Sequence, residues 1–150
     1  MKLVIISGSV YGTADLVADE AADTASAAGF EVVRMKTASV DALLSEHPDA
    51  LLVCCATTGM GEIPDNLMAF HVELRDRFPL LTDMPCAVIA LGDSAYGDTF
   101  CLAGEQFRDT LLELQAREIV PMLRLDASET VTPETDAQPW LKTFLAALRP

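Results

Sequence analysis

The segment from Ser7 to Asp15 reads SGSVYGTAD and lies between an apolar run and a helical pattern. A strand that enters a helix through a turn of small residues forms an anion site, because unpaired backbone N–H groups and the positive end of the helix dipole face the turn. The segment supplies hydroxyls and glycines but neither Lys nor Arg. It therefore predicts a phosphate site whose donors are neutral. A plain Ser-capped helix after a first strand is the alternative interpretation.

Two common nucleotide-binding patterns do not fit this segment. A P-loop needs G-x-x-x-x-G-K-[ST], with the Lys reaching the outer phosphates, whereas Gly8 and Gly12 are four positions apart and no Lys follows them. The dinucleotide fingerprint needs G-x-G-x-x-G and an acidic residue at the end of the second strand. The second strand candidate ends at Met35 and is followed by Lys36. Hydrolysis of a nucleoside triphosphate and binding of a dinucleotide are both disfavoured.

The chain is strongly acidic. It contains 23 Asp and Glu against 10 Lys and Arg, which gives a net charge of −13. Nucleic acid and anionic membranes would be repelled by this charge, so we expect neither as a partner. A basic protein surface would be attracted to it. A surface that is acidic only for solubility is the other interpretation.

Length and cysteine usage indicate the class of protein. A chain of 150 residues is expected to form a single domain over residues 1–150. Its cysteines lack both C-x-x-C and metal spacing, so buried reduced thiols and no metal site are expected; they are Cys54, Cys55, Cys86 and Cys101. Lys2 precedes only four apolar residues, which does not match a signal peptide, and no apolar run has the length of a membrane span. We expect a cytoplasmic protein that is monomeric.

Apolar runs of strand length alternate with helical patterns along the chain. Strands are expected at Lys2–Ile6, Phe30–Met35, Ala50–Ala56, Ala87–Leu91 and Ile119–Leu123. Helices are expected at Thr13–Ala28, Val40–Glu46, Asn66–Arg77, Ala103–Ala116 and Thr135–Leu148. Three of the strand segments contain continuous apolar runs, as parallel strands covered on both faces do. The alternation predicts an α/β fold, a three-layer αβα sandwich around a doubly wound five-stranded parallel sheet, with the flavodoxin-like order 2-1-3-4-5 as the best fit.

In such sheets, ligands bind beyond the carboxyl ends of the strands, so the loops after strands one, three and four are the informative ones. After the third strand comes ATTGMGEIPDN (56–66), and after the fourth comes LGDSAYGDTFC (91–101). Together with the first segment, these loops resemble the three FMN-binding loops of flavodoxins and of the flavodoxin-like domain in diflavin reductases. The third loop and the downstream LRLDASE (123–129) are most similar to the short-chain flavodoxins of the YqcA and MioC type. The resemblance spans essentially the whole chain.

The resemblance implies FMN as the cofactor and assigns residues to it. The loop that wraps the FMN phosphate is matched by Ser9, Tyr11, Gly12, Thr13 and Ala14. The loop over the dimethylbenzene and central rings is matched by Thr57, Thr58, Gly59 and Gly61. In a third family loop, a tyrosine stacks on the isoalloxazine and backbone groups bind the pyrimidine edge. This loop is matched by Gly92, Asp93, Tyr96 and Cys101.

The chain departs from the family pattern at three places. Tyr11 stands where many members have Thr, so one phosphate hydroxyl is lost or replaced by a phenol. Thr58 stands where many flavodoxins place Trp or another aromatic against the second face of the flavin. The segment between Tyr96 and Cys101 is one residue longer than the family spacing. Weaker coverage of one flavin face is therefore expected.

The resemblance implies a low-potential, one-electron carrier and not an enzyme with catalytic residues of its own. FMN accepts electrons one at a time, and the protein decides which redox forms are favoured. The net charge disfavours negative charge on the reduced flavin and so lowers the potential of the last reduction. We expect an NADPH-dependent flavodoxin or ferredoxin reductase as the electron donor and basic-faced redox enzymes as acceptors.

Two other functions remain as alternatives. One is a self-sufficient FMN-dependent NAD(P)H:quinone or flavin reductase, although the length leaves no room for a separate nicotinamide-binding domain. His47 and His71 fall in or at the ends of helical segments without a Ser or Cys nucleophile pattern, so no catalytic residues are predicted. The other is a phosphorylation receiver, which needs acidic residues at the ends of strands one and three; these strands are followed by Ser7 and Thr57.

Overall fold

The computed structural model describes residues 1–58 and 60–149. Its sheet is parallel and has the order β2-β1-β3-β4-β5, with β6 also paired to β4. The strands are β1 (Lys2–Gly8), β2 (Glu31–Met35), β3 (Ala50–Ala56), β4 (Pro85–Gly92), β5 (Arg117–Glu118) and β6 (Leu123–Asp126). The predicted doubly wound order 2-1-3-4-5 is confirmed.

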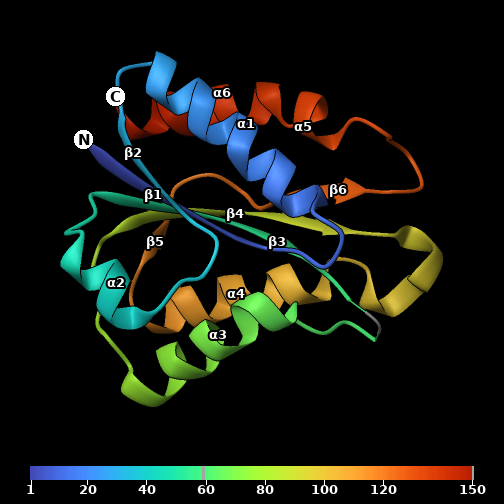
Figure 1. The fold of residues 1–150 in the computed structure, drawn as a ribbon, viewed down its shortest axis with the longest axis horizontal. Helices are drawn as coiled ribbons and strands as arrows, with labels where there is room; N and C mark the ends of the chain where they lie inside the picture. The colour runs from blue at the N-terminus through green and yellow to red at the C-terminus, as the bar shows by residue number, and fades with distance from the viewer. Residues whose placement is uncertain (59, 150) are drawn as a thin grey trace.

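Helices cover both faces of the sheet, which gives the three predicted layers (Figure 1). One face carries α1 (Thr13–Ala27), α5 (Pro133–Asp136) and α6 (Gln138–Leu148), and the other carries α2 (Val40–Ser45), α3 (Asp65–Arg77) and α4 (Leu102–Glu113). Side chains of the central strands alternate between the two faces. In β1, Leu3 and Ile5 pack with α1 and α6, whereas Val4 and Ile6 pack with α2, α3 and α4.

The carboxyl ends of the strands meet along one edge of the sheet. The register places Gly8 of β1 beside Cys55 of β3, and Gly92 of β4 beside Asp126 of β6. Four loops therefore begin at this edge: the first loop (residues 9–12), the second loop (57–64), the third loop (93–101) and the fourth loop (127–132). The third loop contains a short 3₁₀ helix, η1 (Ser94–Thr99).

The predicted fifth strand, Ile119–Leu123, is wrong in its position. The structure divides this edge of the sheet into β5 and β6, and of the predicted strand only Leu123 lies in either. Pro121 lies in the gap, and a proline cannot donate a ladder hydrogen bond. Its carbonyl instead accepts from Trp140 Nε1 of α6 at 2.9 Å. Two short strands consequently occupy one strand position beside β4.

The last predicted helix, Thr135–Leu148, is also divided, into α5 and α6. Pro139 lies in the first turn of α6, where its missing N–H costs nothing. The first helix, predicted at Thr13–Ala28, ends one residue earlier at Ala27; Ala28 is its C-cap residue, and Gly29 comes next with φ 93°. Across residues 1–58 and 60–149, none of the helices combines the length and apolar character that crossing a membrane requires.

Candidate functional site

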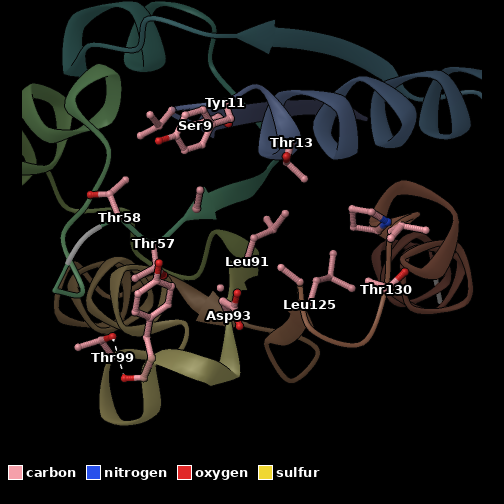
Figure 2. Close-up of a pocket in the computed structure, with 17 residues that line it drawn as sticks. Ser9, Tyr11, Thr13, Thr57, Thr58, Leu91, Asp93, Thr99, Leu125 and Thr130 are labelled. Carbon is pink, nitrogen blue, oxygen red and sulfur yellow. Dashed lines mark hydrogen bonds between the residues drawn. The ribbon is translucent and has the colours of Figure 1, made fainter.

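A cavity of about 630 Å³ opens between the four loops at the carboxyl edge of the sheet. Figure 2 shows Ser9, Tyr11 and Thr13 on one side of this space, and Thr57, Thr58, Asp93 and Thr130 around the rest of it. The residues that line it are Ser9, Val10, Tyr11, Thr13, Ala56, Thr57, Thr58, Leu91, Gly92, Asp93, Tyr96, Thr99, Leu125, Ala127, Thr130, Val131 and Pro133. A cavity of this size holds a cofactor-sized ligand.

The first loop leaves the start of α1 open towards the cavity. Gly12 is the residue that precedes the helix and has φ 89°, a left-handed conformation that only glycine adopts readily. Its N–H donates to Ser9 Oγ at 2.8 Å, which holds the loop in a tight turn. Because Gly12 offers no capping side chain, the first N–H groups of α1 are available to an anion.

Asn66, at the start of α3, holds the first loop in place through hydrogen bonds. This role was not predicted from the sequence. Its Oδ1 accepts the Ser9 N–H at 3.1 Å, and its Nδ2 donates to the carbonyls of Ser7 at 3.4 Å and Lys36 at 3.3 Å. The sequence alone is also compatible with Asn66 as the N-cap of the helix expected after the second loop. The structure instead begins α3 at Asp65 without a side-chain cap.

Below the first loop lies a polar cluster formed by Ser7, Asp15, Asp19 and Arg34. Ser7 is fully buried and donates its hydroxyl to Asp15. Arg34 of β2 donates to Ser7 Oγ at 2.6 Å and forms ion pairs with Asp15 at 3.5 Å and Asp19 at 3.0 Å. The first loop contains no cation of its own, and Arg34 could not be predicted from the loop sequence because it comes from a different strand.

The second loop combines an unsatisfied hydroxyl with a tight turn. Thr57 Oγ1 is buried and has no hydrogen-bond partner among the described residues. Thr58 and Glu62 exchange backbone hydrogen bonds at 2.9 and 2.8 Å, which closes the turn. Gly61 has φ 94°, and a Cβ there would lie 2.5 Å from Leu102 Cδ2. Gly59 lies outside the residues that the structure describes.

The third loop presents an aromatic ring at the rim of the cavity. Tyr96 is 67% exposed and lies on η1. Asp93 caps η1 by accepting the Ala95 N–H at 2.9 Å. Gly92 permits close packing with the end of this loop, because a Cβ there would lie 2.7 Å from the backbone nitrogen of Cys101.

The fourth loop forms a cavity wall that sequence analysis did not assign. It contributes Ala127, Thr130 and Val131, and the adjacent α5 contributes Pro133. The only signal in the sequence was the similarity of the segment 123–129 to short-chain flavodoxins. The Ser128 N–H holds this loop to Asp126 of β6, and the hydrogen bonds that Asp126 accepts from Ser94 and Ser128 lower its pKa.

Eight of the residues assigned from the sequence line the cavity, and the structure brings them together from three loops. These are Ser9, Tyr11, Thr13, Thr57, Thr58, Gly92, Asp93 and Tyr96. Four other assigned residues are not among the described lining residues: Gly12, Ala14, Gly61 and Cys101. Cys101 is fully buried, with its Sγ 3.6 Å from the carbonyl oxygen of Ala90, and burial raises the pKa of its thiol to about 11.

Neither histidine is among the described residues that line the cavity. His71 is buried between α3 and α4, where its Nε2 lies 2.9 Å from Thr110 Oγ1, and burial lowers its pKa. Within the described part of the chain, no group of three or more His, Cys, Asp and Glu side chains could hold a metal ion.

The residues present fit FMN, which carries a phosphate at one end and a planar ring system at the other. The uncapped start of α1 and the neighbouring hydroxyls suit the phosphate, and the described lining residues include no Lys or Arg. A buried hydroxyl rarely stays without a partner, so Thr57 Oγ1 indicates a polar ligand. The Tyr96 ring and the apolar side chains of Leu91 and Leu125 suit the flat ring system.

Comparisons with known proteins agree with this chemistry. The flavodoxin family model matches residues 5–140. Flavodoxin YqcA of Escherichia coli is 35% identical over 95% of both chains. The solved structure of a C101S mutant of a Pseudomonas aeruginosa flavodoxin is 56% identical, covers 100% of both chains and has a TM-score of 0.96. The flavoprotein alpha-component of the NADPH sulfite reductase of Bacillus subtilis is 32% identical, and 98% of this chain matches 24% of that protein. The chain therefore belongs to the flavodoxin family and is an FMN-containing electron carrier.

Proposed function

We propose that this flavodoxin receives electrons from an NADPH-dependent flavoprotein reductase and passes them singly to redox enzymes with basic surfaces. The net charge of −13 supports basic partners, because charge complementarity raises the rate of encounter. This chain matches 24% of the flavoprotein alpha-component of the Bacillus subtilis NADPH sulfite reductase. This similarity supports NADPH as the source of the electrons.

We also propose how the cavity residues hold the cofactor. The first N–H groups of α1, with the hydroxyls of Ser9 and Thr13, bind the phosphate. Thr57 Oγ1 hydrogen-bonds the chain that joins phosphate and ring, because it is buried and has no hydrogen-bond partner among the described residues. Tyr96 stacks against the ring, and backbone groups of Gly92 and Asp93 bind its polar edge. Bound FMN supplies the redox chemistry, since its ring accepts and donates electrons one at a time.

The surroundings of the cavity favour a low potential for full reduction. Glu62 and Asp65 are exposed on and beside the second loop, and Asp93 lines the cavity. Carboxylates close to a ring disfavour additional negative charge on it. Arg34 does not offset them, because it is already paired with Asp15 and Asp19. The chain thus stabilises the oxidised ring relative to the fully reduced one.

An assay with and without a reductase tests the proposed electron donor. The holoprotein is mixed with NADPH and cytochrome c, which serves as a basic acceptor, in the presence and absence of an NADPH-dependent flavodoxin reductase. Cytochrome c reduction should require both proteins and should slow as the salt concentration rises. Rapid NADPH oxidation by the flavodoxin alone, with quinone as the acceptor, would instead support the self-sufficient reductase.

Charge reversal near the cavity tests the proposed acceptors. Glu62→Lys should slow cytochrome c reduction at low salt, because it removes negative charge beside the cavity. Glu113→Lys is the matched control, since Glu113 ends α4 at the opposite edge of the sheet and is also exposed. Equal effects of the two substitutions would show that only the net charge matters and would contradict docking at the cavity.

A further inference from the structure

Arg34 is held beneath the first loop by contacts on three of its nitrogens. Nη2 donates to Ser7 Oγ at 2.6 Å, Nε to Asp19 Oδ1 at 3.0 Å, and Nη1 to the Met35 carbonyl at 2.9 Å. Only 16% of its side chain is exposed. A guanidinium with this many fixed contacts has lost its conformational freedom, so its charge acts from one position.

The positive charge of Arg34 affects phosphate binding because it lies beside the carboxylate of Asp15. It is the third residue of α1, and a carboxylate in the first turn of a helix is stabilised by the same dipole and N–H groups that attract a phosphate. A free carboxylate at that place would repel a phosphate bound at the helix start. Here the carboxylate accepts the Ser7 hydroxyl and lies 3.5 Å from Arg34 Nη2, with 28% of its side chain exposed.

We propose that Arg34 is a positioning residue that makes the first loop selective for the phosphorylated flavin. It neutralises Asp15 and holds this carboxylate against Ser7, which leaves the helix N-terminus to the phosphate. This inference rests on the proposed binding of the phosphate at the first loop. The loop itself contains no cation, so its preference for an anion depends on keeping Asp15 paired.

A purely structural role for the ion pair leads to a different expectation. If the pair only holds β2 against α1, removing either partner weakens the fold and the binding of any flavin. If it also controls the field at the phosphate, the two partners have opposite effects. Loss of Arg34 weakens binding of the phosphorylated flavin. Loss of the Asp15 charge strengthens it, because the positive charge of Arg34 is then balanced by Asp19 alone and attracts the phosphate more strongly.

Titration of the full-length apoprotein with FMN and with riboflavin, followed by flavin fluorescence, separates these cases. The proteins are the wild type, R34Q, D15N, the R34Q/D15N double variant and R34K. R77Q is the matched control, because Arg77 forms an ion pair with Asp41 at 2.9 Å on the exposed surface. The Asn in D15N can still accept the Ser7 hydroxyl, so this variant changes charge more than shape.

R34Q should bind FMN about tenfold more weakly than the wild type and riboflavin within about twofold. D15N should bind FMN more tightly, while the double variant and R34K should keep an FMN-to-riboflavin affinity ratio near that of the wild type. R77Q should change neither affinity. If R34Q fails to fold, which far-UV circular dichroism reports, D15N and R34K still carry the test.

Equal weakening of FMN and riboflavin in R34Q, or weaker FMN binding in D15N, would overturn the inference. A failure of the proposed function looks different. If the wild type itself binds riboflavin as tightly as FMN, the first loop does not hold the phosphate, and the proposed placement of the phosphate is wrong.

Discussion

The carboxylate of Asp126 accepts the backbone N–H of Ser94 at 3.0 Å and thereby ties the end of β6 to the start of η1. The same oxygen accepts the Ser128 N–H at 2.9 Å. In the opposite direction, Asp93 accepts the Ser128 hydroxyl. Each carboxylate thus binds the loop that follows the neighbouring strand, so the third and fourth loops form one unit.

This relationship makes stability depend on pH in a defined direction. Hydrogen bonds from Ser94 and Ser128 hold the pKa of Asp126 below the ordinary value of 3.8. A carboxyl with a lowered folded pKa stabilises the protein fully above its unfolded pKa, and this contribution is lost as the pH falls through the folded value. D126N should therefore be less stable than the wild type at pH 5 to 7, with the difference shrinking below about pH 4.

Urea unfolding of the wild type and D126N at a series of pH values measures this difference. D109N is the control, because Asp109 is exposed on α4 and contacts only the neighbouring Arg108 among the ion pairs of the described residues. A difference between wild type and D126N that stays constant down to pH 3 would show that Asp126 acts through shape and not through its charge.

Thr58→Trp should tighten FMN binding. Thr58 lines the cavity, and the resemblance to flavodoxins implies that an aromatic residue at this position would stack on the flavin. An added stacked ring is worth about 1 kcal/mol, or about fivefold in affinity. The backbone hydrogen bonds with Glu62 do not depend on the side chain and should persist. Thr58→Val is the control for loss of the hydroxyl contact with the Glu62 carbonyl at 3.2 Å. Unchanged FMN affinity in Thr58→Trp would mean that another group already covers this face.

Gly61→Ala should destabilise the protein more than Gly12→Ala does. Both glycines have positive φ, at 94° and 89°, so each alanine costs about 1 kcal/mol in backbone strain. At Gly61 the new Cβ would also collide with Leu102, which adds about 1–3 kcal/mol, whereas at Gly12 it meets nothing within 4 Å. The free energy of unfolding in urea measures the two costs. Equal losses would indicate that the second loop moves freely away from α4.

The thiols should be unreactive in the folded protein. Burial raises the pKa of Cys54, Cys55 and Cys86 to about 12, and that of Cys101 to about 11. Since the thiolate is the reactive form, a chromogenic disulfide reagent at pH 8 should label them much more slowly than in urea. In urea all four should react. Fast labelling of one thiol without urea would indicate local opening of the strand or loop that carries it.

Much of the fold could be predicted because the buried central strands are recognisable in the sequence as apolar runs. The continuous apolar runs of β1, β3 and β4 indicate strands covered on both faces, and the structure buries them. The break at the sheet edge was missed because Ile119 and Val120 extend an apolar pattern up to Pro121. The proline was the available signal, since it excludes a regular ladder.

The candidate site could be predicted where its residues lie in the loops that resemble known flavodoxins. Tyr11, Thr57 and Tyr96 were found in this way, and all three line the cavity. Asn66 and Arg34 were not found, because each acts on the first loop from a separate element, and no local pattern records such a contact. A contact between distant segments depends on strand order, which was itself only an expectation.

The divided strand beside β4 also limits how this protein can associate with other chains. An uninterrupted outer strand exposes a row of backbone donors and acceptors that can recruit a further strand and start aggregation. Here the outer ladder consists of two residues in β5 and four in β6, and the Trp140 indole already occupies the carbonyl of Pro121 between them. The interruption therefore hinders sheet extension at this edge, whereas β2 forms the opposite edge with five continuous residues. Replacing Pro121 would remove part of the protection beside β4.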